Sequence, residues 1–267
     1  MQLEGKVVLV TGGGGGIGAG MAEAFVERGA RVAISDFNLD FARAEAERIG
    51  GGSIALAHDV TDLASWAAVK REIEGQLGPV EVLCNNAGIA VPFMPLEEIA
   101  PEAFARLLAV NVTGVYNGVR TFVPEMKARG AGHLVNTSSL NGLLPYATSA
   151  AYSATKFAVA GMSEALSIEL APFGIGVSIL YPGLTRSRMS ERHLPGADAA
   201  AMLAMRARMM EPVWLGRAVV RAVEENTLHI ITHPDHRPAL EARFDAILAA
   251  HGEPAQPDYA GGRLTQA

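Results

Sequence analysis

Short runs of apolar, often β-branched residues alternate along the chain with longer stretches of helical periodicity. Seven apolar runs begin near residues 6, 31, 53, 80, 133, 176 and 228. Their apolar character is nearly continuous instead of alternating, which is typical of strands buried on both faces. Helical patterns between them cover roughly 17–29, 38–49, 62–77, 101–129, 152–172 and 212–226. This rotation predicts an α/β fold with a doubly wound, mostly parallel, seven-stranded sheet and helices on both faces.

Two segments depart from this rotation. Residues 184–212 interrupt it after the sixth predicted strand, where we expect a substrate lid, and the segment from 251 onward is polar and rich in Gly and Pro. A helical pattern at 235–250 has an apolar stripe that either shields a pocket or contacts a neighbouring subunit. The stripe consists of Leu240, Phe244, Ile247 and Leu248. No repeat or linker divides the remainder, so the sequence predicts one domain over 1–250 and a loosely ordered tail over 251–267.

Composition narrows the class of protein. A chain of 267 residues can bury a complete core and often forms one α/β domain. The formal net charge of −6 argues against nucleic acid or an anionic membrane surface as the main partner. The single cysteine, Cys84, lies in an apolar run and is expected to be a small buried side chain. Without an intrachain disulfide, a leader pattern or an apolar stretch of about 18 residues, we expect a cytoplasmic protein.

The connection after the first predicted strand carries the clearest chemistry. There "TGGGGGIG" precedes a helical pattern, and glycines at such a turn let the backbone approach a pyrophosphate at the helix N-terminus. Gly13, Gly15 and Gly18 satisfy the spacing G-x-G-x-x-G. Gly12, Gly16 and Gly18 satisfy the longer spacing TG-x3-G-x-G. Five consecutive glycines would also suit a flexible linker, but the place between strand and helix favours a dinucleotide site.

Asp36 ends the second predicted strand, 18 residues beyond Gly18. A carboxylate at this place can accept hydrogen bonds from a ribose diol. It also repels a 2′-phosphate, and neither Gly15 nor Phe37 supplies the cation that such a phosphate needs. The sequence therefore predicts NAD as the cofactor in preference to NADP.

The stretch "YSATK" places Tyr152 and Lys156 four positions apart, on one face of a predicted helix. A phenol with an ordinary pKa near 10 exchanges protons poorly at neutral pH, but a neighbouring cation favours phenolate and lowers that pKa. The pair therefore suits general acid and base catalysis. Such pairs also occur by chance on helix surfaces, so the meaning of this one depends on its surroundings.

Taken together, the motifs resemble those of the classical short-chain dehydrogenases/reductases over roughly residues 3 to 190. The resemblance rests on an ordered series: "TGGGGGIG", Asp36, "DV" at 59–60, "NNAG" at 85–88, Asn111, "NTSS" at 136–139, "YSATK" and "PG" at 182–183. It implies a Rossmann-like sheet and an oxidoreductase. Carried over by position, it implies a cofactor-binding set of Gly12, Gly16 and Ile17 at the pyrophosphate, Asp36 at the adenosine ribose, Asp59 and Val60 at the adenine, and Asn85, Asn86, Ala87 and Gly88 beneath the cofactor.

The resemblance also assigns the catalytic roles. It selects Ser139, 13 residues before Tyr152, to orient the substrate oxygen, and leaves Ser138 as its neighbour. Tyr152 would be the general acid and base, and Lys156 would lower its pKa; both would also contact the nicotinamide ribose. The family gives Asn111 a helix kink and a water that extends the proton path, whereas on its own it would be a satisfied buried asparagine.

The segment after the sixth predicted strand is where we expect substrate choice to be set. Past Pro182 and Gly183, the family has a hydroxyl residue at the nicotinamide amide, for which Thr185 and Ser187 are candidates. Arg186, Arg188 and Arg192 form either a solvated cluster or a site for an anionic substrate group. An apolar face would be made by Met202, Leu203, Met205, Met209, Met210 and Trp214, and facing walls by Val91, Pro92, Phe93, Met94, Leu140, Leu143, Leu144, Pro145 and Tyr146. These side chains either close over a substrate or simply pack the segment onto the body.

These walls favour a hydrophobic secondary alcohol or ketone as substrate. His229, His233 and His236 lie near Asp235, but their irregular spacing argues against a metal site. Helix 152–172 keeps apolar or small residues on more than one face, and the family commonly assembles through this helix and the one at 101–129. We therefore expect a homodimer or homotetramer. A regulatory NAD-binding protein and an isomerase or dehydratase with bound NAD remain alternatives on the same fold.

Overall fold

The computed structural model describes residues 1–192 and 199–252, with side chains at 1–190 and 203–252. It divides the chain into two compact units, Met1–His233 and Pro234–Ala267. The predicted domain extended to residue 250, whereas the unit that contains the sheet ends at His233, directly after the last strand. The second unit carries α10 (Arg237–Ala249). On this helix Phe244, Ile247 and Leu248 are exposed.

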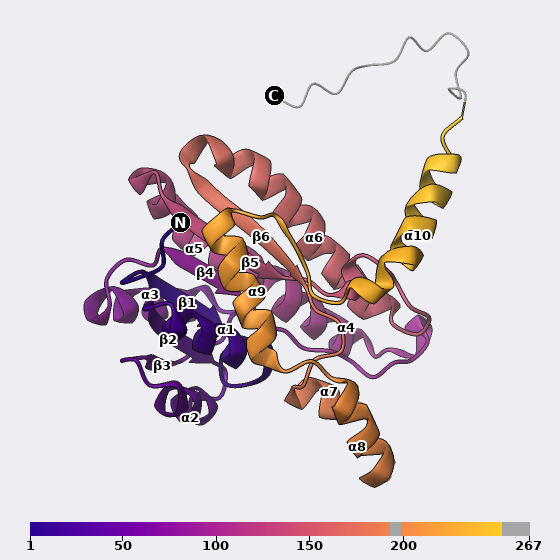
Figure 1. Cartoon of the computed structure of the whole chain (residues 1–267), viewed down its shortest axis with the longest axis horizontal. Helices are drawn as coiled ribbons and strands as arrows, with labels where there is room; N and C mark the ends of the chain where they lie inside the picture. Colours follow the sequence, from indigo (N-terminus) through magenta and orange to yellow (C-terminus); the bar gives the residue numbers. More distant parts are fainter. Residues whose placement is uncertain (193–198, 253–267) are drawn as a thin grey trace. The chain divides into compact units, whose positions relative to one another are not determined.

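A single seven-stranded parallel sheet forms the centre of the first unit (Figure 1). Its strand order is β3-β2-β1-β4-β5-β6-β7, and every neighbouring pair is parallel. The strands are β1 (Val7–Thr11), β2 (Arg31–Asp36), β3 (Ile54–Ala57), β4 (Val82–Asn85), β5 (Gly132–Thr137), β6 (Ile175–Tyr181) and β7 (His229–Ile231). Number, order along the chain and parallel direction confirm the predicted Rossmann-like architecture.

Helices cover both faces of the sheet, as the buried strands require. The helices of this unit are α1 (Gly16–Glu27), α2 (Leu39–Ile49), α3 (Leu63–Gln76), α4 (Pro101–Leu108), α5 (Gly114–Arg129), α6 (Ala150–Leu170), α7 (Arg188–Arg192), α8 (Ala199–Arg208) and α9 (Pro212–Glu225). Successive side chains of β1 point to opposite faces. Val8 and Val10 pack with residues of α1 and α9, whereas Val7 and Leu9 pack with residues of α3 and α5. The result is two apolar layers, one on each side of the sheet.

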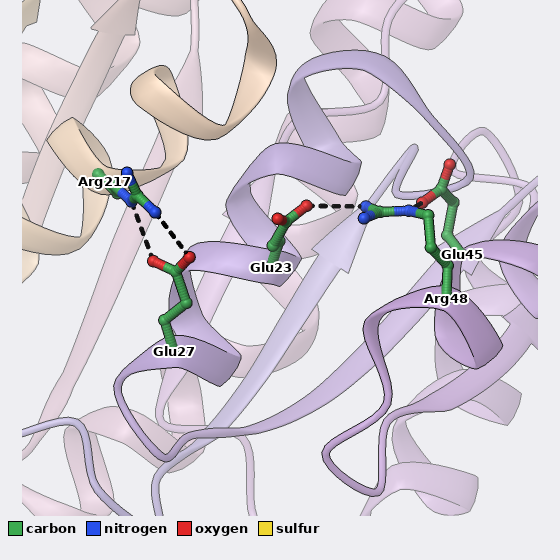
Figure 2. A network of polar contacts seen from close by, with 5 residues as sticks. All are labelled: Glu23, Glu27, Glu45, Arg48 and Arg217. Carbon is green, nitrogen blue, oxygen red and sulfur yellow. Dashed lines mark hydrogen bonds and ion pairs between the residues drawn. The ribbon is translucent and has the colours of Figure 1, made fainter.

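Helices α1 and α9 lie side by side with their backbones in close approach (Figure 1). A Cβ atom at Gly216 would lie 2.0 Å from the Gly20 carbonyl oxygen, and one at Gly20 would lie 2.3 Å from Pro212. Ion pairs reinforce the outer side of α1 (Figure 2). Arg217 of α9 binds Glu27 through two nitrogens at 2.8 and 3.0 Å, and Arg48 of α2 binds Glu23 at 2.9 Å. These pairs are solvent-exposed, so the backbone contact contributes more to holding α9 in place.

The structure divides the predicted helix 101–129 into three parts. A π-helical turn, Ala109–Thr113, separates α4 from α5 and contains Asn111. Because the apolar periodicity continues through this turn, the sequence pattern alone predicts one helix. Among the described residues, no helix has the length and apolarity needed to cross a bilayer.

All strands being parallel, their carboxyl ends lie at one edge of the sheet. The strand order reverses direction between β1 and β4, which in such sheets leaves a crevice at that edge. The turn after β1, the segment after β4, the start of α6 and the loop after β6 all meet there. This edge contains the predicted site.

Candidate active site

A glycine turn after β1 forms the base of the site. Cβ atoms would not fit at two of its positions: one at Gly12 would lie 2.8 Å from the Ala87 Cα, and one at Gly18 would lie 2.4 Å from the Gly12 carbonyl oxygen. No side chain caps the N-terminus of α1, and its first turn contains no acidic residue. Its first N–H groups therefore suit an anion, and the close-packed turn fits a dinucleotide pyrophosphate.

Asp36 is held at the end of β2 by two backbone groups. Its Oδ2 accepts a hydrogen bond from the Gly14 N–H at 3.0 Å, and its Oδ1 accepts one from the Asn38 N–H at 3.0 Å. The carboxylate lines the cavity that begins at the glycine turn. It is thus oriented where a ribose diol of a dinucleotide would need acceptors.

Two adjoining cavities, of about 570 Å³ and about 220 Å³, follow the sheet edge. The larger is lined by the predicted adenine residues Asp59 and Val60, and the smaller by Ile17, Tyr152 and Lys156. Both are lined by Gly12, Asp36, Ala87, Gly88, Arg188 and Met189, so they form one continuous cleft. A cleft that runs from an adenine end to a catalytic end fits an extended dinucleotide.

His58, which the sequence did not single out, also lines the larger cavity. Its Nδ1 is hydrogen-bonded to the Ser35 hydroxyl at 3.0 Å, and its Nε2 is buried without a partner among the described residues. Burial lowers the pKa of His58 to about 4, so the ring is neutral at physiological pH. Its neighbour Asp59 is held by Thr61, whose N–H and hydroxyl both donate to Oδ1 at 2.9 and 2.7 Å.

In the motif "NNAG", Asn85 is buried in the sheet and the next three residues line the cleft. The Asn86 side-chain amide donates to the Thr11 carbonyl at 3.0 Å, and the Asn86 and Ala87 N–H groups both donate to the Thr11 hydroxyl at 3.0 Å. Asn86, Ala87 and Gly88 line the cleft. Asn85 instead lies inside the sheet, where its amide donates to the Asn136 Oδ1 at 2.9 Å. Its contribution to the site is to brace the strands beneath it.

Tyr152 and Lys156 face the cleft from the first turns of α6. The Lys156 Nζ lies 5.5 Å from the centroid of the Tyr152 ring and donates a hydrogen bond to the Thr137 carbonyl at 2.9 Å. The Ser139 hydroxyl lies close enough to the Tyr152 phenol to lower its pKa, and it accepts a hydrogen bond from the Asn141 N–H at 3.2 Å. The neighbouring Ser138 hydroxyl donates to the Lys156 carbonyl at 2.7 Å and so holds α6 against β5. These contacts support Ser139 and not Ser138 as the serine that acts with Tyr152.

The ionisation of this pair differs from the prediction. Burial raises the pKa of Tyr152 to about 12, and the hydrogen bond with Ser139 opposes that rise only in part. Burial also lowers the pKa of Lys156 to about 8. The expected lowering of the Tyr152 pKa by Lys156 is therefore wrong for the protein without cofactor. The cost of burying the phenolate outweighs the attraction of the Lys156 ammonium. That ammonium donates to the Thr137 carbonyl, and its own charge is disfavoured by burial.

Asn111 makes its hydrogen bonds inside the protein, beside the catalytic helix. Its Oδ1 accepts from the Ile89 N–H at 2.8 Å, while its Nδ2 donates to the Ile89 carbonyl at 2.9 Å and to the Thr155 hydroxyl at 3.2 Å. It lies within the π-helical turn Ala109–Thr113. A Cβ at Gly88 would lie 3.4 Å from the Asn111 Oδ1 and 3.6 Å from the Lys156 Nζ, so the three groups converge.

The loop after β6 places its hydroxyl residues differently from the prediction. Thr185 is buried, and its hydroxyl donates to the Gly183 carbonyl at 3.1 Å. Ser187, the other candidate, lines the smaller cavity together with Pro182. His233 braces this turn, because the Gly183 N–H donates to its Nδ1 at 3.1 Å. His233 and Gly183 are 50 residues apart, so no local sequence pattern could have predicted this contact.

The three arginines of the loop do not form one cluster. Arg186 makes an ion pair with Glu211 at 2.7 Å. Arg188 instead donates to the Gly14 carbonyl at 2.6 Å and stacks on Phe41, with its Cζ 3.9 Å from the ring centroid. The side chain of Arg192 lies outside the described residues. Arg188 is thus a cleft residue that its position in the sequence does not reveal.

The predicted apolar walls are only partly assembled in the described residues. Met209, Leu140 and Leu144 are buried, while Leu203, Trp214, Phe93 and Tyr146 are exposed. The side chain of Met202 lies outside the described residues. The Met94 N–H donates to the Thr148 carbonyl at 3.0 Å and so joins two of the wall segments. In the described part of the chain, no three His, Cys, Asp or Glu side chains lie close enough to bind a metal ion.

Comparisons with known proteins agree with this geometry. The family model for short chain dehydrogenases matches residues 6–197. The chain is 32% identical to the C alpha-dehydrogenase of Sphingobium sp. (strain NBRC 103272 / SYK-6), with 98% of this chain and 91% of that protein covered. A short-chain dehydrogenase structure from Novosphingobium aromaticivorans has a TM-score of 0.85 and 37% identity, covering 97% of this chain and 91% of that one.

A short-chain dehydrogenase/reductase from Burkholderia phymatum, solved in complex with NAD, has a TM-score of 0.84 and 27% identity, and covers 96% of this chain and 99% of that one. The chain belongs to the short-chain dehydrogenase family, and it is an oxidoreductase of the kind that binds a nicotinamide dinucleotide.

Proposed function

We propose that this protein is an NAD-dependent dehydrogenase that interconverts a hydrophobic secondary alcohol and its ketone. The observation that carries the proposal is the position of Tyr152 and Lys156, with Ser139 beside the phenol, in a cleft that is also lined by the glycine turn and Asp36 and that continues to Asp59 and Val60. A phenol, a hydroxyl and an ammonium in this order suit proton exchange with a substrate oxygen.

The side chains have separate tasks in the proposed reaction. The bound nicotinamide would supply or accept the hydride. Ser139 holds the substrate oxygen, and Tyr152 donates a proton to it in reduction or accepts one in oxidation. The Lys156 ammonium, 5.5 Å from the centroid of the ring, attracts the phenolate that oxidation requires, but this attraction is smaller than the cost of burying that phenolate. Because the pKa of Tyr152 is raised to about 12, the resting phenol is protonated and ready to donate.

Asp36 supports NAD over NADP. Its carboxylate is fixed by the Gly14 and Asn38 N–H groups beside the cavity where the adenosine ribose would bind. A negative charge there favours a free diol and disfavours a 2′-phosphate. The exposed Phe93 and Tyr146 support a hydrophobic substrate, since apolar side chains on this edge would otherwise face water.

Assembly into a homodimer or homotetramer belongs to the same proposal. Helix α6 has an exposed Ile168, and α5 has an exposed Tyr116. Large apolar side chains on these two helices would be covered in such an assembly. Light scattering of the purified protein gives its mass in solution, and a monomer would contradict this part of the proposal.

The test is NADH formation with a panel of secondary alcohols that range from short aliphatic to polycyclic. Stoichiometric NADH with wild type, and its absence with Tyr152→Phe protein that still binds NADH, would support the proposal. Binding of NADH without turnover of any alcohol or ketone would favour a regulatory protein. Substrate conversion without net NADH would favour an isomerase or dehydratase, and either outcome would overturn the dehydrogenase assignment.

A further inference from the structure

The loop after β6 crosses directly over the glycine turn. A Cβ atom at Gly15 would lie 2.9 Å from the Arg188 guanidinium, and one at Gly16 would lie 2.8 Å from the Ser187 Cβ. The lack of side chains at these two glycines is therefore what allows residues 187 and 188 to lie there. The backbone N–H of Ser187 donates to the Ser190 hydroxyl, and the N–H of Ser190 donates to the Ser187 hydroxyl. These hydrogen bonds keep this part of the loop in a tight turn.

Among the described residues, the contacts that hold Arg188 at this place bring no carboxylate within ion-pair distance of its guanidinium. Its Nη2 donates to the Gly14 carbonyl at 2.6 Å, and its guanidinium lies over the Phe41 ring at 3.9 Å from the centroid. A carbonyl and an aromatic face orient a guanidinium but carry no formal negative charge. The neighbouring Arg186, by contrast, has its charge paired with Glu211 at 2.7 Å.

The guanidinium lies where the two halves of the cleft meet. Arg188 lines both the adenine-side cavity and the catalytic-side cavity, as do Gly12, Ala87 and Gly88. In an extended dinucleotide the pyrophosphate lies between the two nucleosides, hence at this junction. A planar guanidinium can bind phosphate oxygens through two parallel hydrogen bonds, which a lysine cannot do.

We propose that Arg188 binds the pyrophosphate of the dinucleotide beside the N-terminus of α1, an inference that rests on the proposed function. The first N–H groups of α1 and the guanidinium would then both donate to the two phosphates. In a protein of net charge −6, a local cation at this point offsets the general repulsion of an anionic cofactor. The alternative phosphate is the 2′-phosphate of NADP, but Asp36 lines the same two cavities and would repel it.

The test compares Arg188→Gln and Arg188→Lys with a control, Arg186→Gln, which removes the same charge from the same loop outside the cleft. Titration calorimetry with NADH, NADPH and ADP-ribose measures binding independently of turnover. A charge-assisted contact predicts that Arg188→Gln weakens all three ligands about 10-fold or more, with a smaller loss for Arg188→Lys. Arg186→Gln should stay within about twofold of wild type, and binding by Arg188→Gln should depend less on salt.

The outcomes separate this inference from the function on which it rests. Equal affinities of wild type and Arg188→Gln for ADP-ribose would overturn the Arg188 inference and leave the dehydrogenase proposal intact. Weaker binding of NADPH alone would overturn it too, because the contact would then be to the 2′-phosphate. Failure of wild type to bind any of the three ligands would overturn both. Circular dichroism and thermal unfolding of each variant identify any loss of affinity that comes from misfolding.

Discussion

Replacing Lys156 with methionine should change how the stability of this protein depends on pH. The Lys156 Nζ is buried, and burial lowers its pKa from the ordinary 10.5 to about 8. Methionine has a similar length and no charge. The variant therefore removes the titrating group while keeping most of the volume that the side chain fills.

The direction follows from proton binding in the two states. Below pH 8 the lysine is charged in both the folded and the unfolded chain, and the folded state bears the full cost of burying that charge. Between pH 8 and 10.5 the unfolded chain binds more protons than the folded one, so this cost disappears as the pH rises. At about 1.4 kcal/mol per pKa unit, wild type should gain roughly 2.5 kcal/mol from pH 7 to pH 10 relative to Lys156→Met.

Two other effects do not obscure this difference. The Thr137 carbonyl loses its hydrogen-bond donor in the variant, which lowers stability by an amount that does not vary with pH. Burial raises the pKa of Tyr152 to about 12, so the tyrosine reduces stability only above its unfolded pKa near 10. Measurements at and below pH 10 therefore report on Lys156.

The assay is urea unfolding of both proteins at several pH values from 7 to 10 and at one protein concentration, since assembly would add to stability. Lys127→Met, a change of an exposed lysine on α5, serves as the matched control. The quantity of interest is the difference in unfolding free energy between wild type and each variant. If this difference for Lys156→Met is the same at pH 7 and pH 10, the burial argument is refuted.

Four further results are expected. Tyr152→Phe should lower kcat by about 10²-fold or more without loss of NADH binding, as measured by NADH formation, because general acid and base catalysis typically contributes this much. Rates of alcohol oxidation should rise with pH up to about pH 11, because the pKa of Tyr152 is raised to about 12 and phenolate is scarce below it, whereas ketone reduction should stay nearly constant over the same range because the phenol keeps its proton; pH–rate profiles in both directions check this. Asp36→Ala should reduce the preference for NADH over NADPH about 10-fold, measured as the ratio of dissociation constants, and an unchanged ratio would count against the ribose role. Gly216→Ala should destabilise the protein by about 1–3 kcal/mol in urea unfolding, because its Cβ would meet the Gly20 carbonyl at 2.0 Å.

The strands were predictable because each is a short apolar run bounded by turn residues, and the structure confirms all seven within a few residues. Asp36 and Tyr152 were predictable for a related reason. Asp36 ends a strand and Tyr152 begins a helix, and in a parallel sheet both places lie at the same edge. Three features were not. The apolar period continues through the π-helical turn at Asn111, so only the family resemblance implied a break there. Arg188 reaches Gly14 across a large sequence separation, and the rise of the Tyr152 pKa depends on burial. Each requires the assembled tertiary structure.

The contacts of α1 have a consequence for how this enzyme could change its substrate. Ser187 touches the position of Gly16, and Pro212 touches Gly20, so two points of the chain far apart in sequence attach to one helix about one turn apart. The chain therefore leaves α1 at Ser187 and returns to it at Pro212, close to where it left. Residues after Arg188 and before Pro212 can be exchanged, added or deleted without moving either attachment, since lengthening a closed loop costs little entropy. New specificities can thus arise by replacing one excursion of the chain while the dinucleotide machinery stays unaltered.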